Sequence, residues 1–80
     1  MKDTPEVAEY LIDITTAKVA EIMARESGRT TAECMREFMS TRTFEVLDCR
    51  ESYLYHESVE YVLDMLDDER RGDFESWREI

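Results

Sequence analysis

The chain contains only two glycines and one proline among its 80 residues, and all three stand where a helix would begin or end. Because these residues form many tight turns, their scarcity limits chain reversals and favours a few long helices. Thr4 and Pro5 have the form of a helix cap and a first helical residue. Gly28 and Gly72 stand where two helices would stop. The sequence therefore predicts a single small all-α domain.

Apolar residues at helical spacing divide the chain into four predicted helices. The first covers about residues 5–26. The second opens with a capping box at Thr30-Thr31-Ala32-Glu33 and ends near Ser40. A short third helix is predicted with Thr43 as its cap, and the fourth covers about residues 57–71.

The first helix carries apolar residues over a wide arc, which indicates a central helix contacted from more than one side. We expect the second and fourth helices to pack across it. Residues 52–55 are predicted to form an aromatic linker, although Tyr53 and Tyr55 alternate as they would in a short strand. The predicted core consists of Leu11, Ile14, Ile22, Phe38, Leu47, Val59, Leu63 and Leu66.

Residues 1–72 make up the predicted helical domain, and residues 73–80 form a short amphipathic tail. Phe74, Trp77 and Ile80 stand three positions apart, so they would share one face of a helical turn. We expect the tail either to dock on the domain or to bind a partner.

Cys34 and Cys49 are the only cysteines, and neither lies in a CxxC motif. We predict two buried thiols without a disulfide, as is usual in the reducing cytoplasm. A chain of this size is near the lower limit for a self-sufficient core, so a homodimer or a bound partner would supply useful additional burial.

Acidic residues outnumber basic ones by 20 to 10, which gives a net charge of −10. The excess is greatest in residues 57–80, where nine acids and three bases give −6, and smallest in residues 27–56, where five and four give −1. Such a field repels phosphate backbones and anionic lipid and attracts basic proteins. No apolar run approaches the roughly 20 residues of a membrane span, and no signal-peptide pattern is present. We expect a cytoplasmic protein with no membrane contact.

The sequence lacks the motifs of common catalytic and cofactor sites. Neither glycine belongs to a phosphate-binding loop, and no serine lies in GxSxG. His56 and Glu60, four residues apart, could begin a metal site, but zinc needs three or four ligands and the chain has no second histidine. A helix start with capping acids explains this pair better. We predict a protein that is not an enzyme and holds no cofactor or metal.

Ala24, Gly28 and Cys34 have the spacing of a helix-turn-helix. The second predicted helix would be the recognition helix. Two of its four candidate contact residues are acids, which DNA phosphates repel. A DNA-binding regulator is therefore an alternative, with nucleic acid as a less favoured partner. Its candidate DNA contacts are Thr31, Glu33, Arg36 and Glu37 on the recognition helix. Arg29 and Arg42, which flank that helix in the sequence, are further candidates.

A series of short motifs over residues 8–68 resembles a known family. The turn Gly28-Arg29-Thr30-Thr31 comes first, and Arg36-Glu37-Phe38-Met39 closes the next helix. Thr43–Cys49, Leu54-Tyr55-His56 and the acidic helix opening Ser58-Val59-Glu60-Tyr61-Val62 follow. In this order they resemble a family of small helical bacterial proteins of unknown function, although Tyr55 is inserted into the usual Leu-His and Arg-Thr replaces the usual Gly-Lys.

The resemblance implies a mostly helical fold, and no catalytic residues carry over from it. Genes of that family often lie beside a gene for a toxin-like protein with an ADP-ribosyltransferase-like fold. The resemblance therefore implies an antitoxin-like or accessory role.

Charge and the lack of catalytic motifs favour a module that binds a basic protein. Acids would steer the encounter, and buried aromatic side chains would anchor the complex. The main alternatives are the DNA-binding regulator and a structural homodimer formed through Tyr53, Tyr55 and the tail. The predicted partner-binding residues are Glu60, Asp64, Asp67 and Asp68 on the fourth helix and Phe74 and Trp77 in the tail.

Overall fold

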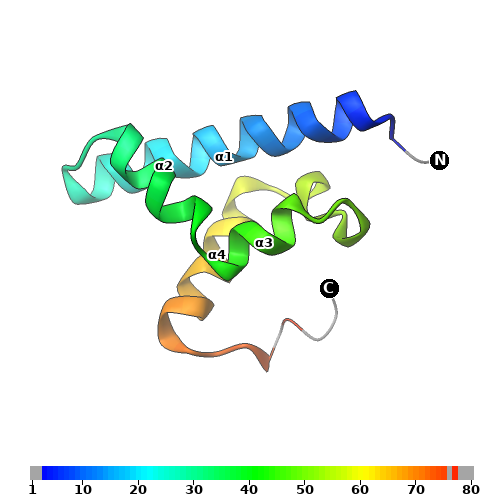
Figure 1. The fold of residues 1–80 in the computed structure, drawn as a ribbon. Helices are drawn as coiled ribbons and strands as arrows, with labels where there is room; N and C mark the ends of the chain where they lie inside the picture. Colours follow the sequence, from blue (N-terminus) through cyan, green and yellow to red (C-terminus); the bar gives the residue numbers. More distant parts are fainter. Residues whose placement is uncertain (1–2, 76, 78–80) are drawn as a thin grey trace.

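The computed structural model describes residues 3–75 and 77, and the elements within these residues are all helical. Figure 1 shows α1 as a long bar along one side of the molecule, with the other helices gathered beneath it. The prediction of an all-α domain with four helices and a long first helix is confirmed. The α-helices are α1 (Pro5–Ser27), α2 (Thr31–Met39), α3 (Arg42–Asp48) and α4 (Val59–Arg71), and the short 3-10 helices η1 (Arg50–Ser52) and η2 (Leu54–His56) lie between α3 and α4.

The ends of α1 follow directly from the residues that stand there. The Thr4 hydroxyl accepts a hydrogen bond of 3.2 Å from the Val7 N–H, and Pro5 opens the helix. Gly28 closes it with a φ of 74°, and its N–H donates to the Ala24 carbonyl over 2.9 Å. Gly72 ends α4 with a φ of 72°. A side chain is strained at such positive φ values, so glycine suits both helix ends.

The capping box of α2 is also present as predicted. The Thr30 hydroxyl accepts from the Glu33 N–H over 3.1 Å, and the Glu33 carboxylate accepts from the Thr30 N–H over 3.2 Å. Two backbone donors that the first helical turn leaves without helical partners are satisfied in this way.

The predicted start of the third helix is wrong. Thr41, and not Thr43, is the cap of α3, and its hydroxyl accepts from the Phe44 N–H over 3.1 Å. Thr43 is fully buried, and both its N–H and its hydroxyl donate to Glu69 of α4 over 2.8 Å. Because that partner lies 26 residues away, the local sequence did not reveal this role for Thr43.

The segment predicted as an aromatic linker contains the two short 3-10 helices η1 and η2, and the alternative of a short strand is wrong. Tyr53 joins them with a φ of 55°, a left-handed conformation that is costly for a residue with a side chain. The helix α4 starts at Val59 with Ser58 as its cap, two residues later than predicted.

The core takes a different stripe of α1 from the one predicted. Ala8, Ile12, Val19, Ala20 and Met23 are buried, whereas the predicted core residues Ile14 and Ile22 are only half-buried. Small side chains in the buried stripe let neighbouring elements approach α1 closely. The other predicted core residues are buried (Phe38, Leu47, Leu66) or half-buried against the core (Leu11, Val59, Leu63).

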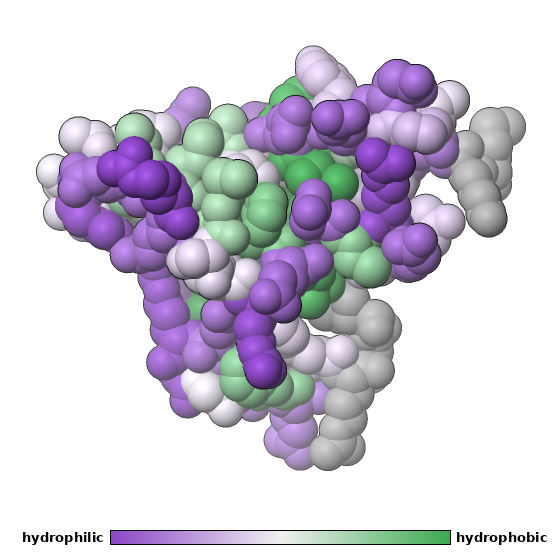
Figure 2. Space-filling view, viewed as in Figure 1, coloured by the Kyte–Doolittle hydropathy of each residue, from purple (hydrophilic) through white to green (hydrophobic). Residues whose placement is uncertain are grey.

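Both α2 and α4 contact α1, as predicted, and the contact with α2 is the more extensive. Phe38 of α2 and Phe44 of α3 join these helices with an edge-to-face ring contact of 5.6 Å between centroids. Figure 2 shows that hydrophobic residues gather near the middle of one face, over α2 and between α1 and α3, while hydrophilic residues border them. Within the described residues, no helix has the length and apolar character needed to cross a membrane.

The two cysteines differ in environment. Cys34 is buried as predicted, but Cys49 is exposed, so the prediction of a second buried thiol is wrong. Cys49 is the residue that ends α3, and its position after the last helical turn places it at the surface.

Candidate functional site

A groove with an apolar floor and acidic borders lies between α1 and α4. Its volume is about 250 Å³. Met23 of α1 and Leu63 and Leu66 of α4 supply the apolar side chains. We call this feature the acidic groove; its carboxylates are Glu26 of α1 and Glu60, Asp64 and Asp67 of α4.

The helical repeat explains why the three carboxylates of α4 lie together. Glu60, Asp64 and Asp67 are separated by four and three residues, so they share one face of the helix. All three are exposed, whereas Val62, Met65 and Leu66 of the same helix are buried. The helix therefore turns an acidic face outwards along the groove.

Arg70 is the one basic residue among the described residues that line the acidic groove, and it is shared between carboxylates. Its guanidinium lies 3.4 Å from Glu37 of α2 and 4.0 Å from Asp67. Glu37 is also bound by Arg29 over 3.0 Å, and this hydrogen bond is the main reason why the pKa of Glu37 is lowered. With Arg70 engaged at one end, the groove keeps an excess of negative charge.

Asp68 differs from the other predicted acids in its surroundings. It does not line the acidic groove, and its carboxylate pairs with the Arg71 guanidinium. It follows Asp64 by four residues and so stays on the same side of α4, but it is half-buried where the other three acids are exposed. The predicted role of Asp68 in partner binding stays a prediction.

The predicted tail aromatics also lie outside the acidic groove. The Phe74 and Trp77 rings meet edge to face, with centroids 4.9 Å apart, and the Arg42 guanidinium lies 5.6 Å from the Phe74 centroid. Trp77 is half-buried against the core, and Ile80 lies outside the described residues. The structure thus divides the predicted contact residues between two surfaces.

Five of the described residues that line the acidic groove were not among the predicted site residues, namely Leu63, Leu66 and Arg70 of α4 and two residues of α1. Met23 and Glu26 belong to α1, and they meet α4 only because the two helices pack together. Both residues fit the ordinary pattern of the first helix. Their place in the groove could be predicted only by knowing that α1 packs against α4.

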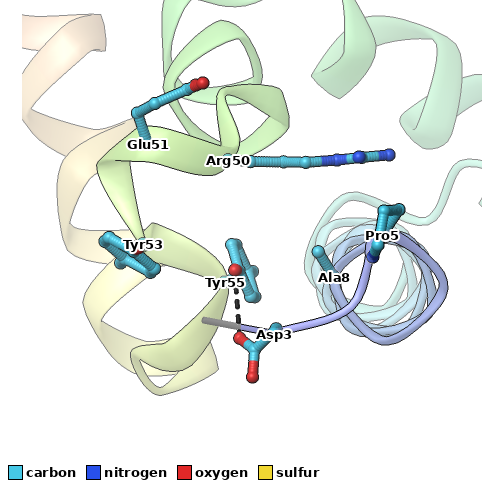
Figure 3. Close-up of a pocket in the computed structure, with 7 residues that line it drawn as sticks. All are labelled: Asp3, Pro5, Ala8, Arg50, Glu51, Tyr53 and Tyr55. Carbon is cyan, nitrogen blue, oxygen red and sulfur yellow. Dashed lines mark hydrogen bonds between the residues drawn. The ribbon is translucent and has the colours of Figure 1, made fainter. Parts of the chain in front are cut away.

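His56 and Glu60, the two residues weighed as the start of a metal site, belong to different elements, and His56 does not lie at the start of α4. It lies in η2, and its Nε2 is 2.5 Å from an Asp3 carboxylate oxygen. The Tyr55 hydroxyl donates to the same oxygen over 3.0 Å, as Figure 3 shows, and Arg50 extends from η1 towards the first turn of α1. Tyr55 is buried, which removes it from the surface assigned to a homodimer. Among the described residues, no cluster of three or more histidine, cysteine, aspartate or glutamate side chains could hold a metal ion.

Acid is expected to release the contact between Asp3 and η2. The hydrogen bond from His56 is the largest cause of the lowered pKa of Asp3, ahead of burial, which raises it. A lowered carboxylate pKa contributes stability above the ordinary value of 3.8, and this contribution is lost as the pH falls through the folded value. An NMR titration should show the Tyr55 ring signals moving in that acidic range. The same titration of Asp3→Asn should lack this step; if it kept the step, another carboxylate would be responsible.

Two arginines proposed for DNA contact are already engaged within the protein. Arg29 pairs with Glu37, and the Arg42 guanidinium lies over the Phe74 ring. These contacts favour the acidic surface over the DNA-binding alternative as the candidate site.

Comparisons of the chain with family models, with curated proteins and with solved structures found no match.

Proposed function

We propose that this protein is a binding module whose acidic groove receives a basic segment of another protein. One observation carries the proposal: four carboxylates from two helices border an apolar floor, and the single arginine beside them is already shared with Glu37. Isolated acids on a helix face are ordinary surface residues, but acids that border apolar side chains can hold a cation while its carbon stem lies on the apolar part.

The dimensions of the groove indicate what it could receive. A volume of about 250 Å³ accommodates a few side chains and not a folded domain. Lysine or arginine stems would lie along the floor of the groove, where Leu63 is half-buried and Met23 and Leu66 are buried, while their charged ends would reach the carboxylates. The net charge of −10 would attract such a segment from a distance, so charge would act mainly on the association rate.

An antitoxin-like or accessory role is the biological setting that we propose. Such a protein would act by covering a basic surface of its partner, and this requires no catalytic group. The mechanism would be occlusion of the partner's surface. Binding of the partner and inhibition of the partner's activity would then depend on the same residues of the acidic groove.

The test compares two triple variants with equal net charge. Replacing Glu60→Gln, Asp64→Asn and Asp67→Asn should weaken binding to a purified basic partner by about tenfold or more and slow association at low salt. The matched control is Glu9→Gln, Asp13→Asn and Glu21→Gln, which removes three exposed acids of α1 outside the groove. Surface plasmon resonance at several salt concentrations would measure both rates.

Equal weakening in both triple variants would show that net charge, and not the acidic groove, controls binding. Unchanged binding in the groove variant would overturn the proposal. Thermal unfolding of both variants, followed by circular dichroism, would establish that each is folded at the assay temperature.

A further inference from the structure

The side of α1 that faces away from the rest of the domain carries an apolar stripe. Val7, Tyr10, Ile14 and Ala17 follow one another at intervals of three, four and three residues, so they share one face of the helix. We call these four residues the outer stripe. At about 100° per residue, the outer stripe lies about half a turn around the helix axis from the buried stripe of α1.

Within the described residues, the fold leaves the outer stripe largely uncovered. Tyr10 is 64% exposed and Val7 is 44% exposed. Ile14 and Ala17 are half-buried, but the described half-buried residues that pack against the core include Leu11 of α1 and neither of these two. In Figure 1 the other elements lie on one side of the N-terminal half of α1, which is drawn in blue. The apolar arc of α1 is therefore wider than the domain itself needs.

The surroundings of the outer stripe carry little net charge. Within about 80° of its centre around the helix axis, α1 has three acids and two bases, namely Glu6, Asp13, Glu21, Lys18 and Arg25. Their sum is −1, whereas the whole chain carries −10. The acidic groove lies on the other side of α1, where the buried Met23 lines it. A basic partner is thus attracted to the groove, and the outer stripe is a place where two copies of this acidic chain meet little opposing charge.

Two of these charges are complementary across a pair of parallel helices. With the outer stripe at positions a and d of a heptad, Asp13 takes position g and Lys18 takes position e. In a parallel pair, a residue at g faces the residue five positions later in the other helix, and Lys18 is five residues after Asp13. Two Asp13–Lys18 pairs would therefore flank the stripe. An antiparallel pair would instead bring Asp13 towards Asp13 of the second copy.

Both side chains are available for this contact. Asp13 and Lys18 are exposed, and neither has an ion-pair partner in the described part of the chain. Glu21 takes the next position a and would meet its own counterpart, so repulsion between like charges ends the contact there. The contact would therefore cover about three turns of α1.

We propose that the protein forms a parallel homodimer through the outer stripe of α1. The four residues of the stripe would pack against the same residues of the second copy, and Asp13 would pair with Lys18 on both sides. A small domain buries a limited core, so this contact would add burial that the single chain lacks. It involves neither the acidic groove nor Tyr53, Tyr55 and the tail, which were the surface predicted for a homodimer from the sequence.

Sedimentation equilibrium of the purified protein from about 10 µM to 1 mM would measure the dimer directly. We expect a dissociation constant of about 0.1 mM, because the contact is smaller than a standard interface. Tyr10→Glu should weaken the dimer at least about tenfold, since it places a charge within the stripe. Tyr61→Glu is the matched control, because it makes the same change at an exposed tyrosine of α4. It should leave the dissociation constant nearly unchanged.

A charge reversal tests the parallel arrangement. Asp13→Lys and Lys18→Asp should each weaken the dimer about fivefold or more, because each brings like charges together. The double variant restores both pairs, and its dissociation constant should return to within about twofold of the wild-type value. Asp13→Lys also lowers the net negative charge, so a dimer limited only by overall repulsion would become stronger in that variant. Circular dichroism would establish that every variant is folded.

A chain that stays monomeric up to about 1 mM would overturn the inference. A dimer that Tyr10→Glu leaves unchanged would exclude this surface, and failure of the double reversal to restore the dimer would exclude the parallel arrangement. These variants change no residue of the acidic groove, so neither result bears on the proposed function. The binding test of the groove is run far below the dissociation constant of the dimer, where its control variant with Asp13→Asn is monomeric like the wild type.

Discussion

Replacing Phe38 with alanine is expected to lower the free energy of unfolding by about 3–5 kcal/mol. The Phe38 side chain is fully buried, and its ring meets that of Phe44 edge to face at 5.6 Å. The substitution removes the contact between α2 and α3 and leaves a cavity in the core. Domains of this size are stable by only about 5–10 kcal/mol, so much of the stability would be lost. Urea unfolding followed by circular dichroism would measure the change.

Met39 provides the matched control for this prediction. It is the next residue of α2 but is half exposed, so Met39→Ala should change stability by no more than about 0.5 kcal/mol. If Phe38→Ala proved equally mild, the packing of α2 on α3 would not be the one described.

Replacing Glu69 with glutamine is expected to cost about 2 kcal/mol. The Glu69 carboxylate of α4 caps α3 from outside, because it accepts from the Arg42 N–H over 3.0 Å and from the Thr43 N–H and hydroxyl over 2.8 Å. Hydrogen bonds to a charged acceptor are stronger than neutral ones, and glutamine has only one oxygen to offer. Thr43 is fully buried, so water cannot replace the lost partner.

The same contact predicts how stability depends on pH. Partial burial raises the pKa of Glu69, but hydrogen bonds from the Arg42 N–H and from Thr43 outweigh it, and the net pKa is lowered. The stabilisation is therefore present above the ordinary value of 4.5 and is lost as the pH falls through the lowered folded value. The difference in unfolding free energy between wild type and Glu69→Gln should shrink across that range.

Glu57→Gln is the control for the Glu69 measurements, because Glu57 is exposed and precedes α4. It should leave both the stability and its pH dependence nearly unchanged. A pH profile of Glu69→Gln parallel to that of the wild type would contradict the capping role.

The local signals in the sequence predicted the helix ends well. Thr4, the capping box at Thr30 and Glu33, and the two glycines act through neighbours within a few residues, so their roles can be read without the fold. Thr43 could not be read in this way, since Glu69 satisfies it from another helix. The same limit explains the core of α1, where two apolar stripes compete and only the packing partners decide between Ile12 and Ile14.

The candidate site was predictable to the same extent. The acidic face of α4 follows from the spacing of Glu60, Asp64 and Asp67, and the structure places these residues together. The contribution of Glu26 depends on how α1 meets α4, and the environment of Trp77 depends on how this residue meets α3. The sequence pattern of one helix by itself predicts neither of these contacts.

The distances along the chain between contacting residues also set an order in which the structure should form. A short turn joins α1 and α2, so this helical hairpin closes a small loop. The cap from Glu69 to Thr43 spans 26 residues, and the contact from Tyr55 to Asp3 spans 52. The entropy lost on closing a loop grows with its length, so the hairpin should be an early folding unit. The N-terminal contact should form last and be the first to open when the native protein fluctuates.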